Sequence, residues 1–145
     1  MPSAVYAAFF FTVALLVTTA YFLMGGLPLL VLKHDVPLDA RFVRGFFRVY
    51  YRAAFWTALG ACISYALWGR PAFAVGAALL AGLALLLGRH LLQAMQRLGA
   101  QIEASDAAAV RRFRRVHVLT LAINLAQLVL LVWGLIRLSR QLSGA

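Results

Sequence analysis

Acidic side chains are nearly missing from this 145-residue chain. It has four, Asp35, Asp39, Glu103 and Asp106, against fourteen basic residues, and none of the four lies in a long apolar run. Small proton-coupled drug exporters need a carboxylate buried in the membrane, and four-helix glutathione transferases rely on a buried glutamate. The scarcity of acids therefore argues against both classes.

Cysteine is also scarce, because Cys62 is the only one. A single cysteine allows no intrachain disulfide and no CxxC redox pair, which argues against quinone-linked disulfide oxidoreductases. The first apolar run has no Lys or Arg before it, whereas a secretory signal peptide begins with a basic region. We therefore expect a first helix that is retained.

Charged residues make up only 12% of the chain and hydrophobic residues 64%. A soluble domain is nearer half apolar and a quarter charged, so lipid is the expected solvent. The net charge of +10 does not predict a nucleic-acid partner, because the basic residues lie at the ends of long apolar runs. Basic residues at such places attract anionic lipid headgroups instead.

Four segments are long enough, or nearly so, to cross the roughly 30 Å hydrocarbon core of a bilayer. They are residues 4–32, 46–68, 71–92 and 116–136 of a single domain, 1–145. The sequence Trp68-Gly69-Arg70-Pro71 predicts a tight turn that makes its flanking helices antiparallel neighbours. The predicted fold is an all-α integral membrane protein, an antiparallel bundle of four transmembrane helices with cytoplasmic helical extensions.

The basic residues indicate the orientation of this bundle. Eleven of them fall in residues 33–52 and 89–115, and only Arg70, Arg137 and Arg140 lie on the other side. The positive-inside rule then predicts both termini outside and both basic stretches in the cytoplasm. Thirteen arginines against one lysine, with abundant Ala and Leu, are typical of a high-GC bacterium. We expect a multi-pass protein of a bacterial inner membrane.

Both basic stretches are predicted to be helical. The arginines of the first recur at spacings of three, four and four, which is one helix face. The second reads as a hairpin over 93–115 that turns at 104–105, with Ser105 or Asp106 capping the next helix. We predict that both stretches bind anionic lipid headgroups, with a specific anionic ligand as the alternative. The arginines concerned are Arg41, Arg44, Arg48, Arg52, Arg111, Arg112, Arg114 and Arg115.

Small residues mark expected helix contacts, because lipid supplies no hydrophobic drive between helices. The expected rows are Ala53, Thr57 and Ala61, with Gly60 and Ser64, in the second span, and Ala74, Ala78 and Gly82, then Gly88, in the third. In the first span, Gly25, Gly26 and Pro28 should loosen or kink the helix. These three residues indicate either close packing or a hinge or ligand-access notch near the cytoplasmic face.

A polar stripe runs along the fourth span. His117, Thr120, Asn124 and Gln127 recur at spacings of three, four and three, on one face of an otherwise apolar helix. An unpartnered polar group in hydrocarbon costs several kcal/mol, so the stripe should face the bundle interior or an oligomer interface. Interhelical hydrogen bonding, a ligand cavity and a polar path all remain open for it.

Three histidines, His34, His90 and His117, are expected at the cytoplasmic ends of their spans. Three imidazoles at one height could bind zinc, copper or a haem iron, so haem or a metal is a possible cofactor. None of the pairs has a close ligand spacing such as HxxxH. Interfacial polar anchoring is the alternative role.

The segment RRFRRVHVLTLAINLAQLVLL resembles the last span of small four-helix membrane proteins of unknown function, a family that includes the cisplatin-resistance-associated transmembrane protein. Phe113, His117, Thr120 and Asn124 carry the resemblance. The Gly-Gly-Leu-Pro stretch before a basic loop is also similar to anthrone-oxygenase-type four-helix proteins. Both resemblances imply a four-helix architecture and single out His117 and Asn124, but neither implies a reaction.

No catalytic set is recognisable: there is no Ser–His–Asp arrangement, embedded carboxylate pair or phosphate loop. We therefore favour a non-enzymatic membrane protein, either an accessory or assembly subunit or a binder of a small ligand. One alternative is a haem- or metal-binding redox protein that uses the three histidines. Another is an oligomeric channel or transporter lined by the stripe from His117 to Gln127, and an enzyme acting on a hydrophobic substrate also stays open. We expect a homo-oligomer or a subunit of a larger membrane complex.

Overall fold

Four long α-helices and one short 3₁₀ helix make up the structure, a computed structural model that describes residues 2–34, 36–103 and 106–143. The α-helices are α1 (Pro2–Gly26), α2 (Pro37–Leu67), α3 (Pro71–Glu103) and α4 (Ala107–Ser143), and the 3₁₀ helix is η1 (Pro28–Val31). The prediction of an all-α fold is confirmed for the described residues.

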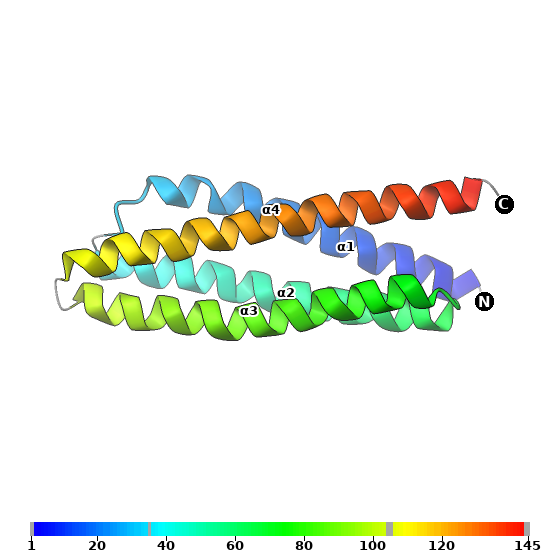
Figure 1. Ribbon diagram of the computed structural model, residues 1–145, viewed down its shortest axis with the longest axis horizontal. Coiled ribbons are helices and arrows are strands. Elements are labelled where there is room, and N and C mark those ends of the chain that lie inside the picture. The colour runs from blue at the N-terminus through cyan, green and yellow to red at the C-terminus, as the bar shows by residue number, and fades with distance from the viewer. Residues whose placement is uncertain (1, 35, 104–105, 144–145) are drawn as a thin grey trace.

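The helices alternate in direction, so the start of α1 and the end of α4 lie at the same end of an elongated bundle (Figure 1). Three segments are long and apolar enough to cross a membrane: Ser3–Val31, Pro71–Ile102 and Ala107–Arg140. Helix α2 does not reach that hydropathy, because its first half carries Arg41, Arg44, Arg48 and Arg52. The structure thus supports an apolar helical bundle of the kind found in membranes.

The turn between α2 and α3 is as tight as the sequence predicts. Gly69 adopts a φ of +75°, a left-handed conformation that glycine takes without a steric penalty. The N–H of Gly69 bonds to the Ala66 carbonyl at 3.1 Å, and the N–H of Arg70 bonds to the Tyr65 carbonyl at 2.9 Å. This pair of bonds closes α2 before Pro71 starts α3, and α2 and α3 share the most extensive contact in the bundle.

The described residues of both basic stretches are helical, as predicted, except for residues 33, 34 and 36 at the start of the first and Asp106 before α4. Helix α2 runs without a break from Pro37 through its arginines into the apolar half, and α3 continues to Glu103. The carboxylate Oδ1 of Asp106 accepts the N–H of Ala108 at 2.8 Å, which caps α4. The predicted hairpin turn at 104–105, with Ser105 as the other possible cap, lies outside the described residues.

The first predicted span, 4–32, is divided in the structure. Helix α1 ends at Gly26 and the chain continues as η1, with Pro28 in the first turn of that 3₁₀ helix. Proline lacks an N–H and its ring clashes with the preceding turn of an α-helix. The predicted loosening at Gly25, Gly26 and Pro28 therefore coincides with the end of α1.

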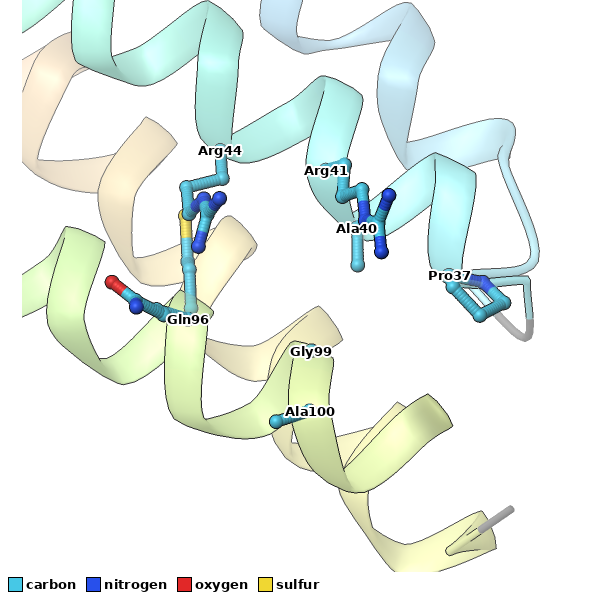
Figure 2. Close-up of a pocket in the computed structure, with 8 residues that line it drawn as sticks. Pro37, Ala40, Arg41, Arg44, Gln96, Gly99 and Ala100 are labelled. Carbon is cyan, nitrogen blue, oxygen red and sulfur yellow. The ribbon is translucent and has the colours of Figure 1, made fainter. Parts of the chain in front are cut away.

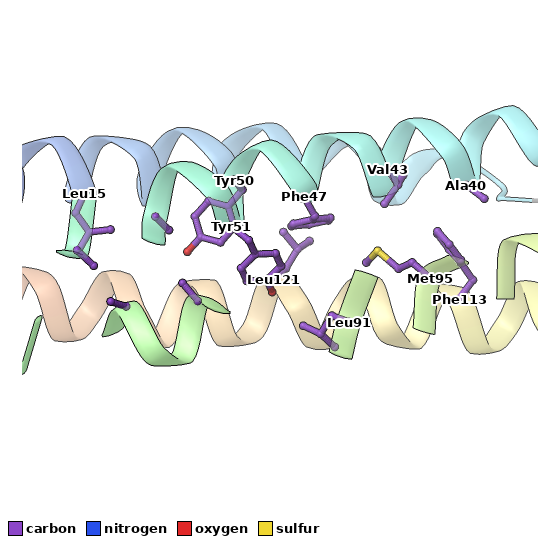
Figure 3. Packing of buried hydrophobic residues seen from close by; sticks show 14 of the residues in the cluster. Leu15, Ala40, Val43, Phe47, Tyr50, Tyr51, Leu91, Met95, Phe113 and Leu121 are labelled. Atoms are coloured by element: carbon purple, nitrogen blue, oxygen red, sulfur yellow. The ribbon is translucent and has the colours of Figure 1, made fainter. Parts of the chain in front are cut away.

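The core of the bundle follows one face of α2. Val43, Phe47, Tyr50 and Ala54, at spacings of four, three and four, are each at most 4% exposed. Figure 3 shows the first three pointing from α2 into the bundle, on the side where Leu121 of α4 lies. The buried face of α2 is therefore offset from the face that carries the arginines.

The small-residue prediction is confirmed in part: Gly60 and Gly88 closely approach Phe11 and Tyr51, and Ala61, Ser64 and Ala74 are buried. The other members of the alanine rows differ from the prediction. Helix α2 buries Ala54, Ala58 and Ala61, and α3 buries Ala74, Ala77, Ala81 and Ala84, whereas Ala78 is exposed. Alanines are so frequent in both helices that several rows fit the helical period. Only the packing partners decide between these rows.

Candidate functional site

The polar stripe of α4 is buried inside its own bundle. His117 and Thr120 are fully buried, Asn124 is 1% exposed and Gln127 is 6% exposed. The stripe therefore faces α1 and α2 and not the outer surface of the bundle. An oligomeric channel lined by the stripe would require the bundle to open.

Hydroxyl groups of α1 and α2 meet the stripe. The Tyr50 hydroxyl donates to Oε1 of Gln127 at 2.7 Å, and the hydroxyl of Thr19 on α1 donates to the Leu15 carbonyl at 2.8 Å. The Tyr51 hydroxyl donates to the Thr120 oxygen, because the hydrogen of Thr120 goes to the Val116 carbonyl. The sequence analysis missed both tyrosines as partners of the stripe. The four-three-four spacing that Tyr50 shares with Val43, Phe47 and Ala54 could have identified it as core-facing.

His34 and His117 form a buried pair. Nε2 of His34 lies 3.2 Å from Nδ1 of His117, and Nε2 of His117 lies 3.2 Å from the Gly26 carbonyl oxygen. A carbonyl can only accept, so a neutral His117 carries its hydrogen on Nε2 and accepts from His34 through Nδ1. The pair ties the segment after η1 and the end of α1 to α4.

The backbone at His34 is left-handed, with a φ of +59°. Such a conformation is uncommon for a residue with a Cβ and costs of order 1–3 kcal/mol. The His34 ring packs against Phe113 and His117, with ring centroids 5.5 and 5.4 Å apart. These contacts hold the strained residue with its side chain fully buried.

His90 does not join the other two histidines. It is exposed on α3, where its neighbour Leu91 takes the buried position. Among the described residues, no three His, Cys, Asp or Glu side chains form a group suited to a metal ion. Two imidazoles fall short of the three or four protein ligands of a typical zinc site. The geometry does not bring together the expected set of His34, His90 and His117.

Asn124 stands apart from the rest of the stripe. Neither its Oδ1 nor its Nδ2 has a hydrogen-bond partner among the described residues. An unsatisfied buried polar group costs about 1–3 kcal/mol. Asn124 is therefore the least well satisfied residue of the stripe.

The glycines of the predicted hinge are closely packed. A methyl group built on Gly25 would lie 2.8 Å from the Phe46 ring, and one built on Gly26 would lie 2.5 Å from Leu121. The absence of a side chain at Gly26 thus lets the end of α1 approach α4. This approach brings the Gly26 carbonyl within reach of His117.

An apolar cleft of about 560 Å³ opens among all four helices, in the half of the bundle that contains the chain ends. Its lining includes Leu15 of α1, Ala61 of α2, Gly76 of α3 and Gly134 of α4. Sequence reasoning missed the cleft because its walls are ordinary Leu, Ala and Gly residues. Gly76 and Gly134 were the available sequence signal for the cleft, because a larger side chain at either position would leave less room.

A pair of hydroxyls and one cation supply the polar groups of this cleft. The Thr12 hydroxyl donates to the Ala8 carbonyl at 2.7 Å and lies 2.9 Å from the Tyr65 hydroxyl, which must then donate to Thr12. The lone pairs of the Tyr65 oxygen remain as acceptors. The Arg137 guanidinium stacks on Trp133 at 4.8 Å, and both residues belong to the lining.

The predicted lipid-facing arginines lie at the other end of the bundle. Seven of the eight are exposed, and Arg44 alone is half-buried. Arg114 donates to the Leu30 carbonyl at 3.3 Å, a further tie between α4 and η1.

The resemblances noted from the sequence stay predictions after comparison with known proteins. No protein-family model, curated protein or solved structure matches this chain.

Proposed function

We propose that this protein is a four-span, non-enzymatic protein of a bacterial inner membrane that binds a lipid-like molecule in the apolar cleft. Both chain ends would face the periplasm and both basic stretches the cytoplasm. The alternating helices support this orientation, because they place eleven of the fourteen basic residues between the middle of the bundle and the end opposite the termini. The positive-inside rule places that end in the cytoplasm.

The second span of this proposal is the apolar half of α2. Residues 53–67 of α2 carry no charge and extend about 22 Å at a rise of about 1.5 Å per residue. This length is less than the roughly 30 Å hydrocarbon core. Arg52 and Arg70, at the two ends, can extend their long side chains toward the headgroups.

The observation that carries the binding proposal is the cleft of about 560 Å³ between the helices. Ligand sites are concave, mostly apolar and furnished with a few polar groups, and this cleft has that character. In the proposed orientation its open side faces hydrocarbon, so its natural occupant is a hydrophobic molecule. The acceptor lone pairs of Tyr65 favour one that carries a hydroxyl or amide donor.

The test is to identify what stays bound to the protein in mild detergent. Gly76 and Gly134 line the cleft, and a Cβ at either would meet no atom within 4 Å, so leucine at both positions fills the space. The wild type should retain one hydrophobic species per chain by mass spectrometry. The Gly76→Leu/Gly134→Leu variant should retain about tenfold less, equivalent to about 1.4 kcal/mol of binding energy.

The matched control is Gly82→Leu, which makes the same change on α3 at a position with equally open surroundings outside the cleft. It should retain the species as the wild type does. Equal retention by all three proteins would refute the proposal. A co-purifying protein subunit in place of the lipid would indicate an accessory role, and the same native masses would report whether copies of the chain assemble.

A further inference from the structure

A second cavity, of about 290 Å³, lies at the basic end of the bundle, between the start of α2 and the end of α3. Small residues create it, because Ala40 of α2 faces Gly99 and Ala100 of α3 across the gap. A Cβ at Gly99 would lie 3.7 Å from the Cβ of Ala40, which is ordinary contact. The two helices thus lie close together, but their small side chains leave part of the space between them unfilled, and this space is the groove.

The polar lining of this groove is cationic. Figure 2 shows Arg44 extending from α2 toward α3, which contributes Gln96, while Arg41 lies beside Ala40 at the edge of the groove. None of the described lining residues is acidic. Arg44 is also the half-buried member of the eight arginines, so its guanidinium is partly shielded from water. A cation in such a place interacts more strongly with an anion than an exposed cation does.

The groove lies just outside the headgroup layer, and this step rests on the proposed membrane orientation. Arg89 is the first charged residue after the apolar run of α3, and Gln96 follows seven residues later. At a rise of about 1.5 Å per residue, Gln96 lies about 10 Å beyond Arg89 along the helix. The polar layer on each side of a bilayer is about 5–8 Å deep, so the groove borders the headgroups on their aqueous side, within reach of long arginine side chains.

We propose that this groove is a binding site for a phosphate group, carried by an anionic lipid or by a small soluble phosphate compound. Guanidinium groups present paired N–H donors that match phosphate oxygens, and Arg41 and Arg44 supply two such groups. The Gln96 carboxamide supplies a further N–H donor from the opposite wall. The site is distinct from general attraction to the membrane surface, because it depends on the shape of the groove.

The experiment separates shape from charge with three variants. Arg44→Gln removes the half-buried guanidinium, and Ala100→Leu fills the groove from its exposed side without changing the charge. Arg140→Gln is the control, since it removes an equal charge from an exposed position at the far end of α4, outside the set of arginines predicted to bind headgroups. Each purified variant is checked for its helix content by circular dichroism before binding is measured.

The probes are phosphatidylglycerol, phosphatidylcholine and inorganic phosphate, titrated separately and followed by native mass spectrometry or calorimetry. The wild type and Arg140→Gln should bind an anionic probe, and Arg44→Gln and Ala100→Leu should each bind it about tenfold more weakly. Preference for phosphatidylglycerol, with no binding of inorganic phosphate, assigns the site to a lipid headgroup. Binding of inorganic phosphate that is lost in Ala100→Leu assigns it to a soluble phosphate compound.

Two results would overturn the proposal. One is weakening by Arg44→Gln with no effect of Ala100→Leu, which would show that charge and not the shape of the groove determines binding. The other is the absence of binding to any of the three probes. The cleft at the opposite end is tested with different variants and a different class of molecule, so failure at one site leaves the other test intact.

Discussion

At the scale of single residues, the interior of this protein contains several buried polar side chains. Most stripe residues have a partner on another segment, as Gln127 has in Tyr50 and His117 has in His34 and Gly26. Asn124 has none among the described residues. The two amides, one turn apart on α4, should therefore respond in opposite ways to replacement by leucine.

Asn124→Leu should increase the free energy of unfolding, by about 1–3 kcal/mol, because it replaces unpaired buried polar atoms with an apolar side chain of similar size. Reversible unfolding in mixed micelles, followed by circular dichroism, measures this change. A decrease would mean that the carboxamide has a partner in the membrane, such as a bound water or ligand.

Gln127→Leu is the companion variant, and it should lower the free energy of unfolding by about 1 kcal/mol. The reason is the loss of the 2.7 Å hydrogen bond from the Tyr50 hydroxyl. The two variants should change the free energy of unfolding in opposite directions, although both replace an amide with leucine on the same helix.

At the scale of helices, close approach depends on a few glycines. A methyl group built on Gly60 of α2 would lie 2.6–2.8 Å from three atoms of the Phe11 ring on α1. The Phe11 ring is rigid, so it cannot move aside by rotating a single terminal bond, as the end of a flexible side chain can. By contrast, a methyl group on Gly45, also in α2, would meet no atom within 4 Å.

Gly60→Ala should therefore destabilise the bundle by about 1–3 kcal/mol through overpacking. Gly45→Ala should stabilise it by about 0.5–1 kcal/mol, because alanine loses less conformational entropy in a helix. Unfolding under the conditions used for Asn124→Leu tests both. If the two variants behave alike, α1 and α2 do not approach at Gly60 as the structure describes.

At the scale of the whole molecule, the two ends of the bundle differ in chemistry. The end with the chain termini holds a large apolar cleft, and the opposite end holds a smaller cationic groove. In the proposed orientation the first would face the outer leaflet and the second the cytoplasmic headgroups. This assignment depends on which end of the bundle faces the cytoplasm.

Cysteine labelling tests that direction. In a Cys62→Ala background, the exposed positions Ser139 and Gln101 lie at opposite ends of the bundle and each can carry a single cysteine. Ser139→Cys should react with a membrane-impermeant maleimide in intact spheroplasts, and Gln101→Cys only after permeabilisation. The reverse pattern would place the basic end outside and remove the basis for the depth assigned to the groove.

The sequence alone determined the helical class, the tight turn at Gly69, the helical nature of both basic stretches and the apolar character of three of the four helices. These features depend on local composition and helical periodicity, which can be read from short segments of the sequence. It could not predict the register of the alanine rows, because several rows fit the same helical period.

Only the tertiary structure decided which distant residues meet. It joined His34 to His117 across 83 positions and left His90 outside, and it gave Gln127 a partner in Tyr50. It also created both cavities, where Gly76 and Gly134 or Ala40 and Gly99 leave space between helices. The rotation and separation of packed helices are set by side chains far apart in the sequence, so periodicity can indicate a buried face but cannot name what lies against it.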